Sequence, residues 1–136
     1  MKVLVCDPIS QTGIEHLQQQ DGLETIVLDR CHSEEELLPI VKDVSAMAVR
    51  SETKVTKAIL EAAPEMRIVG RAGVGVDNID IEAATQNGVI VMNTPGGNTT
   101  ATCELTFSMM MALARNIPQA HGSMAIGEWN RKAFKG

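Results

Sequence analysis

With 136 residues, the chain has the length of one domain and is short for a two-domain enzyme. Its composition is globular, with 44% hydrophobic and 21% charged residues, and a net charge of −5 argues against nucleic acid and anionic membranes as partners. The cysteines Cys6, Cys31 and Cys103 lie far apart, which favours free thiols and a cytoplasmic protein. We expect neither a membrane span nor a signal peptide.

Strand and helix signals alternate along most of the chain. Short aliphatic runs predict strands at residues 2–6, 24–28, 46–49, 67–70 and 89–92. Between them, start and stop signals predict helices at residues 10–20, 33–42, 57–63 and 81–86. Ser33 and Glu36 form the pattern of a capping box, and Asp80 is placed to cap the fourth helix. Regular β–α alternation with few aromatic residues predicts an α/β fold with a flavodoxin-like open parallel sheet.

From Thr99 onward the pattern changes to one long helix over residues 99–116, which is apolar on almost every side. A helix of this kind is normally buried, and its own small sheet cannot cover it. We therefore expect a second domain or another copy of the chain to cover it. The sequence predicts an α/β domain over residues 1–98 and a helix with the start of a connection over 99–136.

Two loops with glycines follow the fourth and fifth strands. The first contains Gly73, Val74 and Gly75, and the second is Asn93-Thr-Pro-Gly-Gly-Asn98. Ligands of parallel sheets bind outside the carboxyl ends of strands, so these loops predict one site for a small anion. A tight turn without a ligand is the alternative for the first loop. Asn98 or its neighbour is expected to cap the long helix, with any ligand role in addition.

The first loop does not fit the dinucleotide-binding fingerprint. The place of the third glycine holds Asn78, and the loop does not lead directly into a helix. Consecutive backbone N–H groups around Val74 can instead bind the edge of a carboxylate or phosphate.

Arg50 and Ser51 close the third strand at the same edge of the predicted sheet. The guanidinium can bind an anion through two parallel hydrogen bonds, and the serine hydroxyl can donate a further one. A salt bridge between Arg50 and Glu52, or another nearby acid, is the alternative. Arg71 is a weaker candidate of the same kind.

None of the three histidines, His16, His32 and His121, falls in these loops, and their spacing with the cysteines does not form a zinc set. The sequence therefore predicts a place to hold an anion, but no metal site and no general acid or base. No catalytic residue is expected in this chain.

Together these motifs resemble the D-2-hydroxyacid dehydrogenase family. The matching runs are Arg50-Ser51, Gly70-Arg-Ala-Gly-Val-Gly-Val-Asp-Asn-Ile-Asp80, Asn93-Thr-Pro-Gly-Gly-Asn98 and the helix from Glu104-Leu-Thr to Leu-Ala-Arg115. The resemblance covers essentially the whole chain, and the pairing of the two loops is typical of the phosphoglycerate branch. It implies an NAD-dependent enzyme that oxidises 3-phosphoglycerate to 3-phosphohydroxypyruvate, the first step of L-serine biosynthesis.

The resemblance also implies roles for individual residues. Those that would bind the phosphate and carboxylate of the substrate are Arg50, Ser51, Gly73, Val74, Gly75 and Asn98. Val74 would also lie beside the nicotinamide, and the helix at 99–116 would form a hinge and the interface of a homo-oligomer.

The residues that such enzymes use to bind NAD and to catalyse hydride transfer are absent from this sequence. We therefore expect a Rossmann domain outside this chain to bind most of the NAD, and we expect the chain to be inactive by itself. Two alternatives remain open. One is a stand-alone module that binds a small anion or a partner without catalysis. The other is the same part of a dehydrogenase for another 2-hydroxy acid, such as glycerate, lactate or glyoxylate.

Overall fold

A computed structural model describes residues 1–135, and Gly136, the end of the expected connection, lies outside the described residues. The chain divides into two compact units, Met1–Gly97 and Asn98–Gly136.

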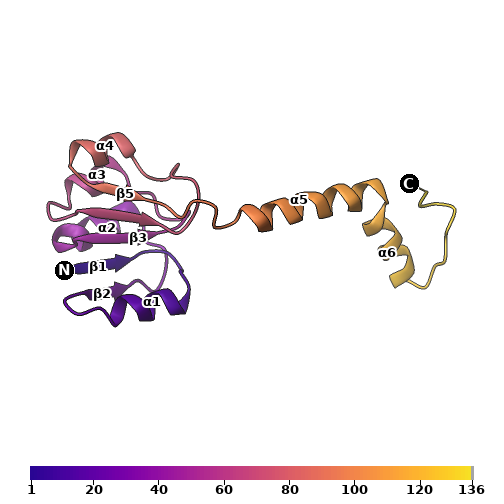
Figure 1. The fold of residues 1–136 in the computed structure, drawn as a ribbon, viewed down its shortest axis with the longest axis horizontal. Coiled ribbons are helices and arrows are strands. Elements are labelled where there is room, and N and C mark those ends of the chain that lie inside the picture. Colours follow the sequence, from indigo (N-terminus) through magenta and orange to yellow (C-terminus); the bar gives the residue numbers. More distant parts are fainter. Residues whose placement is uncertain (136) are drawn as a thin grey trace. The chain divides into compact units, whose positions relative to one another are not determined.

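The first unit is built on a five-stranded parallel sheet with the strand order β2-β1-β3-β4-β5 (Figure 1). Its strands are β1 (Lys2–Val5), β2 (Glu24–Val27), β3 (Ala46–Val49), β4 (Ile68–Arg71) and β5 (Ile90–Met92). This order is that of flavodoxin-like folds, so the predicted fold class is confirmed.

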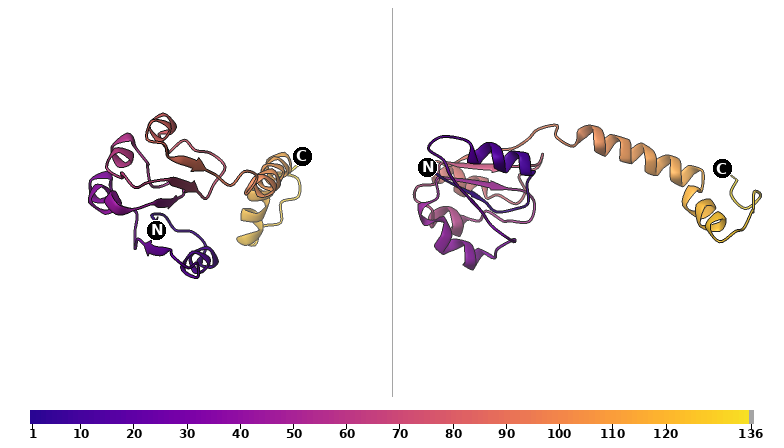
Figure 2. Two further views of the ribbon diagram at one scale, coloured as in Figure 1. Left: turned by 60° about the vertical axis from the view of Figure 1, so that its left-hand side comes forward. Right: turned by 90° about the horizontal axis from the view of Figure 1, so that it is seen from below.

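Helices cover both faces of this sheet. They are α1 (Gln11–Gln18), α2 (Glu34–Ile40) with the 3-10 turn η1 (Val41–Asp43), α3 (Lys57–Glu61) and α4 (Ile81–Gln86). Figure 2 shows α2, α3 and α4 side by side on one face and α1 on the other. This division follows from right-handed crossovers, because the chain moves one way along the sheet to reach β2 and the other way to reach β3, β4 and β5.

The core between the sheet and its helices is aliphatic, as the near absence of aromatic residues requires. Its fully buried side chains include Leu4, Leu37, Val41, Met47, Val49, Ile59, Leu60 and Val69. Burial on both faces of the sheet explains why its strands read as continuous apolar runs.

The predicted helix starts are confirmed by their caps. Ser33 accepts a hydrogen bond from the Glu36 N–H, and the Glu36 carboxylate accepts one from the Ser33 N–H at 2.9 Å, which completes the capping box. Asp80 likewise accepts from the Ala83 N–H at 2.9 Å. These local bonds fix where the helices begin.

Two expectations about the chain after β5 were wrong in detail. Helix α5 (Thr99–Ala114) ends before residue 116, because Asn116 adopts a left-handed conformation with φ of 52° and a new helix, α6 (Ile117–Ala125), begins. Asn98 occupies the N-cap position of α5, but its side chain makes no capping hydrogen bond. The amide of Asn98 is therefore not used to start the helix.

The second unit exposes most of its apolar side chains. On α5 these are Leu105, Phe107, Met109, Met110, Met111 and Leu113, with exposed fractions from 58% to 80%. The unit therefore presents a large apolar surface that its own residues do not cover.

Among residues 1–135, no helix combines the length and the apolar character that a membrane span needs.

Protonation of Glu36 in the capping box should lower the stability of the first unit at acid pH. A hydrogen bond from Arg30, together with the Ser33 N–H, lowers the pKa of Glu36 from its usual 4.5 to about 2. The unfolded chain therefore takes up this proton first as the pH falls. We expect stability to decline between pH 4.5 and 2.

Urea unfolding followed at several pH values checks this expectation. Glu36→Gln should flatten the decline, whereas Glu65→Gln, which removes an exposed glutamate from the turn before β4, should leave it as it is. Equal slopes in the two variants would contradict this role of Glu36.

Candidate anion-binding site

A buried aspartate after β1 holds the loop that follows β3. Asp7 is 3% exposed, and one of its carboxylate oxygens accepts a hydrogen bond from the Arg50 N–H at 2.6 Å. The other accepts from Thr53, at 3.1 Å from its N–H and 2.5 Å from its hydroxyl. Three donors from one loop thus converge on a single carboxylate, which is a strong arrangement.

The carbonyl groups of the same loop are held from the other side. The Asn78 side-chain amide donates to the Arg50 carbonyl at 2.7 Å and to the Thr53 carbonyl at 2.6 Å. The Arg71 Nε atom also donates to the Arg50 carbonyl, at 3.1 Å. The backbone of the loop is therefore fixed at both of its ends.

The Arg50 side chain itself remains exposed, with one hydrogen bond from its Nη1 atom to the Pro8 carbonyl at 3.3 Å. The alternative, a salt bridge from Arg50 to Glu52 or another nearby acid, is not found, since no residue in 1–135 forms an ion pair with Arg50. Its positive charge is thus not neutralised within the first unit.

Arg50 lines a hollow of about 580 Å³ at the carboxyl edge of the sheet. The other residues around it are Pro8, Ile9, Ser10, Gly13, Ala48 and Ala72. The hollow lies where β1 and β3 diverge toward opposite sides of the sheet, which is the position where open α/β sheets bind ligands.

Ser51 does not share that hollow. It lines a different one, of about 420 Å³, with Lys54, Asp77 and Asn78 among its other residues. Ser51 lies in a bend just after β3, and the structure separates two side chains that the sequence suggested would act together.

The glycine loop after β4 offers some of the backbone N–H groups that the sequence suggested for binding an anion. The Gly73 N–H is already bound to the Arg71 carbonyl at 2.9 Å, and so it is not available to a ligand. The N–H groups of Val74 and Gly75 have no hydrogen-bond acceptor among residues 1–135, and the Val74 side chain is 43% exposed. Two of the three expected donors therefore remain free.

A side chain at position 75 would be limited by the space around it and not by the backbone, since the φ of Gly75 is not positive. A Cβ atom there would lie 2.8 Å from Arg71 Nη1 and 2.8 Å from Asp77 Oδ1. These two side chains form an ion pair with an N···O distance of 3.3 Å. Arg71, the weaker anion candidate, is thus paired inside the protein.

The loop after β5 braces the glycine loop. The Asn93 side-chain amide donates to the Val74 carbonyl at 2.7 Å, and the Thr94 N–H donates to the Gly73 carbonyl at 3.0 Å. The two loops therefore meet, as their positions after adjacent strands predicted. Asn98 begins the other unit, at the N-cap position of α5, and its side chain makes no capping hydrogen bond.

The glycine loop also confirms that the dinucleotide fingerprint does not apply. After β4 the next helix, α4, begins only at Ile81, so Gly73 and Gly75 do not stand at a helix N-terminus. The first unit therefore lacks the phosphate-binding turn through which NAD is usually held.

Sequence reasoning missed three residues of this edge, namely Asp7, Asn78 and Asn93. Asp7 directly follows an aliphatic strand, as Arg50 does, and this shared position was a usable signal. The side chains of Asn78 and Asn93 act on distant backbone carbonyls, which no local pattern reveals.

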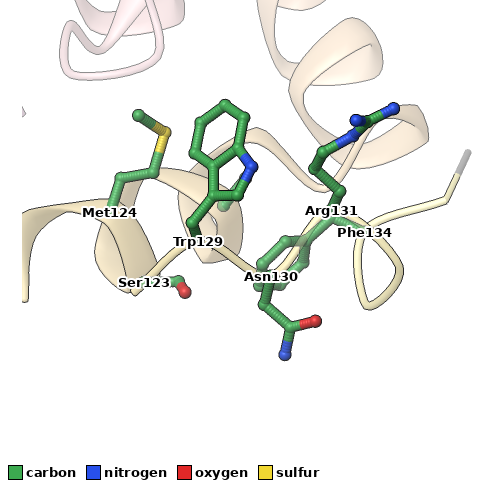
Figure 3. Close-up of a pocket in the computed structure, with 7 residues that line it drawn as sticks. Ser123, Met124, Trp129, Asn130, Arg131 and Phe134 are labelled. Atoms are coloured by element: carbon green, nitrogen blue, oxygen red, sulfur yellow. The ribbon is translucent and has the colours of Figure 1, made fainter. Parts of the chain in front are cut away.

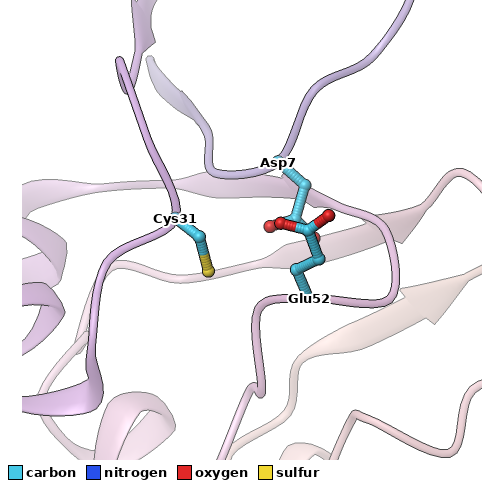
Figure 4. A group of neighbouring side chains, drawn as sticks. All are labelled: Asp7, Cys31 and Glu52. Atoms are coloured by element: carbon cyan, nitrogen blue, oxygen red, sulfur yellow. The ribbon is translucent and has the colours of Figure 1, made fainter.

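Asp7 also lies near Cys31 and Glu52, whose side chains come from separate loops and point toward it (Figure 4). Their ligand atoms all lie within 4.8 Å of one another. Both oxygens of Asp7 are already bound to Arg50 and Thr53, so this cluster does not offer a free buried carboxylate to a metal ion.

All three cysteines are free thiols, and burial raises the pKa of Cys6 to about 12.

The second unit contains a cavity of about 270 Å³ near the end of α6. Figure 3 shows the Trp129 and Phe134 rings on the segment after α6, with Met124 on the helix. Trp129 is 74% exposed, so its indole does not fill a gap within this unit.

Comparison with known proteins identifies relatives along the whole chain. The model of the family "D-isomer specific 2-hydroxyacid dehydrogenase, catalytic domain" matches residues 3–125. All of the chain aligns with D-3-phosphoglycerate dehydrogenases of Archaeoglobus fulgidus, at 51% identity, and Methanocaldococcus jannaschii, at 47%. It spans 25% of the length of each.

Among solved structures, the chain is similar to an NAD+-bound 3-phosphoglycerate dehydrogenase from Entamoeba histolytica. The TM-score is 0.74 at 35% sequence identity, and the match covers 85% of this chain and 39% of that one.

The packing around Gly75 leads to a prediction with a matched control. Gly75→Ala should displace the ion pair of Arg71 and Asp77 and lower the free energy of unfolding by about 1 kcal/mol, because the exposed Asp77 can move aside. Gly73→Ala adds a Cβ at an ordinary distance of 3.6 Å from Arg71 and should change it by less than about 0.5 kcal/mol. Chemical denaturation measures both, and equal effects would contradict this explanation.

Proposed function

The chain belongs to the D-isomer specific 2-hydroxyacid dehydrogenase family, and on this basis we propose that it forms the substrate-binding part of an NAD-dependent phosphoglycerate dehydrogenase. The reaction is the oxidation of 3-phosphoglycerate to 3-phosphohydroxypyruvate, which opens L-serine biosynthesis in the cytoplasm. The names of its relatives from Archaeoglobus fulgidus and Entamoeba histolytica support this substrate.

One observation carries the proposal, which is the state of Arg50. Its guanidinium is exposed at the carboxyl edge, has no carboxylate partner in residues 1–135, and lines the hollow beside β1 and β3. A rigidly held loop that presents an unpaired arginine is suited to a phosphate or carboxylate, which a guanidinium binds with two parallel hydrogen bonds.

Other residues complete the substrate site in this proposal. The free N–H groups of Val74 and Gly75 donate to the substrate. Ser51, the other residue proposed from the sequence, lines a different hollow from Arg50 and is therefore left out of these contacts. Asn98, whose side-chain amide makes no capping hydrogen bond, is the last residue of the proposed substrate-binding part. In this division residues 1–98 bind the substrate, and the residues after them act as a hinge.

NAD enters the proposal as a cofactor bound mainly outside these residues. When bound, it accepts the hydride from the substrate. The residues present do not fit it, because the glycine loop does not open a helix. In this proposal only Val74 approaches the nicotinamide. The chain by itself is therefore expected to bind substrate without oxidising it.

Titration calorimetry with 3-phosphoglycerate tests the substrate site. Arg50→Ala should weaken binding by about tenfold or more, since an interaction with a charged group is removed. Arg67→Ala removes the same charge at the amino end of β4, on the opposite edge of the sheet, and should leave the affinity unchanged.

The outcomes of this titration separate the alternatives. No heat with the folded chain would contradict the proposal. Tighter binding of D-lactate, glycerate or glyoxylate than of 3-phosphoglycerate would keep the family and replace the substrate.

We further propose that α5 mediates association of two copies of the chain. Its apolar side chains are exposed along the whole helix, and exposed apolar surfaces of this extent mark interaction sites. An exposed Trp129 in the same unit fits a contact with a partner subunit.

Sedimentation velocity at several protein concentrations tests this association. Leu113→Glu places a charge on the most exposed apolar position of α5 and should shift the chain toward monomer, because burying an unpaired charge is costly. Gln119→Glu places the same charge on an exposed polar position of α6 and should leave association unchanged. A concentration-independent monomer for the unmodified chain would overturn the proposal.

A further inference from the structure

We infer that Asp7 is a positioning residue for anion binding, because its buried carboxylate fixes the loop that carries Arg50. The inference rests on the proposed function, and it assigns to a residue outside the substrate contacts the task of presenting one of them. Asp7 is not among the residues that line the hollow, and so it acts on the ligand only through the loop.

Within residues 1–135, the hydrogen-bond donors to the Asp7 carboxylate all come from that loop, which also carries the nearby Glu52 carboxylate. No lysine, arginine or histidine forms an ion pair with Asp7 within residues 1–135. Among the described residues, the donors to its carboxylate are the Arg50 N–H, the Thr53 N–H and the Thr53 hydroxyl. Since a buried carboxylate is stable only when its oxygens are well bonded, folding of the first unit requires the loop to adopt this conformation.

The same conformation determines where the Arg50 side chain lies. The Arg50 N–H points to Asp7 at 2.6 Å, and the Arg50 carbonyl points to Asn78 at 2.7 Å and to Arg71 at 3.1 Å. With both backbone groups held, the Cα–Cβ bond of Arg50 has a fixed direction, and the side chain extends toward Pro8 and the hollow beside α1. Without the clamp, Arg50 would pay the cost of ordering the loop at each binding event.

Replacement of the carboxylate by an amide of the same shape removes this clamp. In Asp7→Asn the amide has one oxygen for three donors, and its NH₂ group faces an N–H that needs an acceptor. Thr53→Val is a milder change, since it removes only the hydroxyl donor and keeps the side-chain shape. Asp29→Asn, at an exposed aspartate after β2, is the matched control.

Calorimetric titration of the full chain with 3-phosphoglycerate tests the inference. We expect roughly tenfold weaker binding for Asp7→Asn, a smaller loss for Thr53→Val, and none for Asp29→Asn. In the background of Arg50→Ala, Asp7→Asn should cause no further loss, because both changes act on the same contact. A purely structural residue would lower affinity in both backgrounds.

An NMR signature accompanies these affinities. The amide protons of Arg50 and Thr53, bonded to a carboxylate, should resonate downfield and move upfield in Asp7→Asn while most other amides stay in place. If Asp7→Asn does not fold, Thr53→Val decides the question through the same two readouts.

The outcomes distinguish this inference from the proposed function. If the unmodified chain does not bind 3-phosphoglycerate, both are overturned. If it binds, and both Asp7→Asn and Thr53→Val bind as tightly, only the role of Asp7 is overturned. Additive losses of Asp7→Asn and Arg50→Ala would also overturn it, since they would show that Asp7 does not act through Arg50.

Discussion

The hydrogen bonds of Asp7 link the end of β1 to the turn after β3, and the rest of the carboxyl edge depends on them. These two strands are neighbours in the sheet, and the chain leaves them toward opposite sides. The gap between them is where a parallel sheet exposes strand ends to a ligand. The buried carboxylate of Asp7 lies in part of this gap and binds the backbone N–H of Arg50. It thereby holds Arg50 at the edge without pairing with the guanidinium charge.

The fold of the first unit could be predicted from sequence because its causes are local. Aliphatic runs mark strands that are buried on both faces, and Ser33, Glu36 and Asp80 mark helix starts through bonds to residues three positions away. For a given strand order, the face that each helix covers then follows from the handedness of crossovers. The exposed apolar helix α5 is equally visible in the sequence, since it lacks a polar side.

The site was predictable only in part, since its geometry depends on contacts between distant residues. Asp7 and Arg50 lie 43 positions apart, and Asn78 reaches a carbonyl 28 positions away. Sequence indicated that Arg50 stands at the edge, but not that Ser51 faces a different hollow. It pointed to the backbone N–H groups around Val74, but it could not show that a side chain at Gly75 would meet the ion pair of Arg71 and Asp77.

The central claim is that the exposed charge of Arg50 makes this edge an anion site. An NMR titration of the labelled chain with 3-phosphoglycerate, in which each backbone amide is followed, tests it most directly. We predict saturable shifts concentrated in the loops after β1, β3 and β4, with Arg50, Ser51, Val74 and Gly75 among the residues most affected. Shifts concentrated at the amino ends of the strands, or no saturable shift at all, would contradict it.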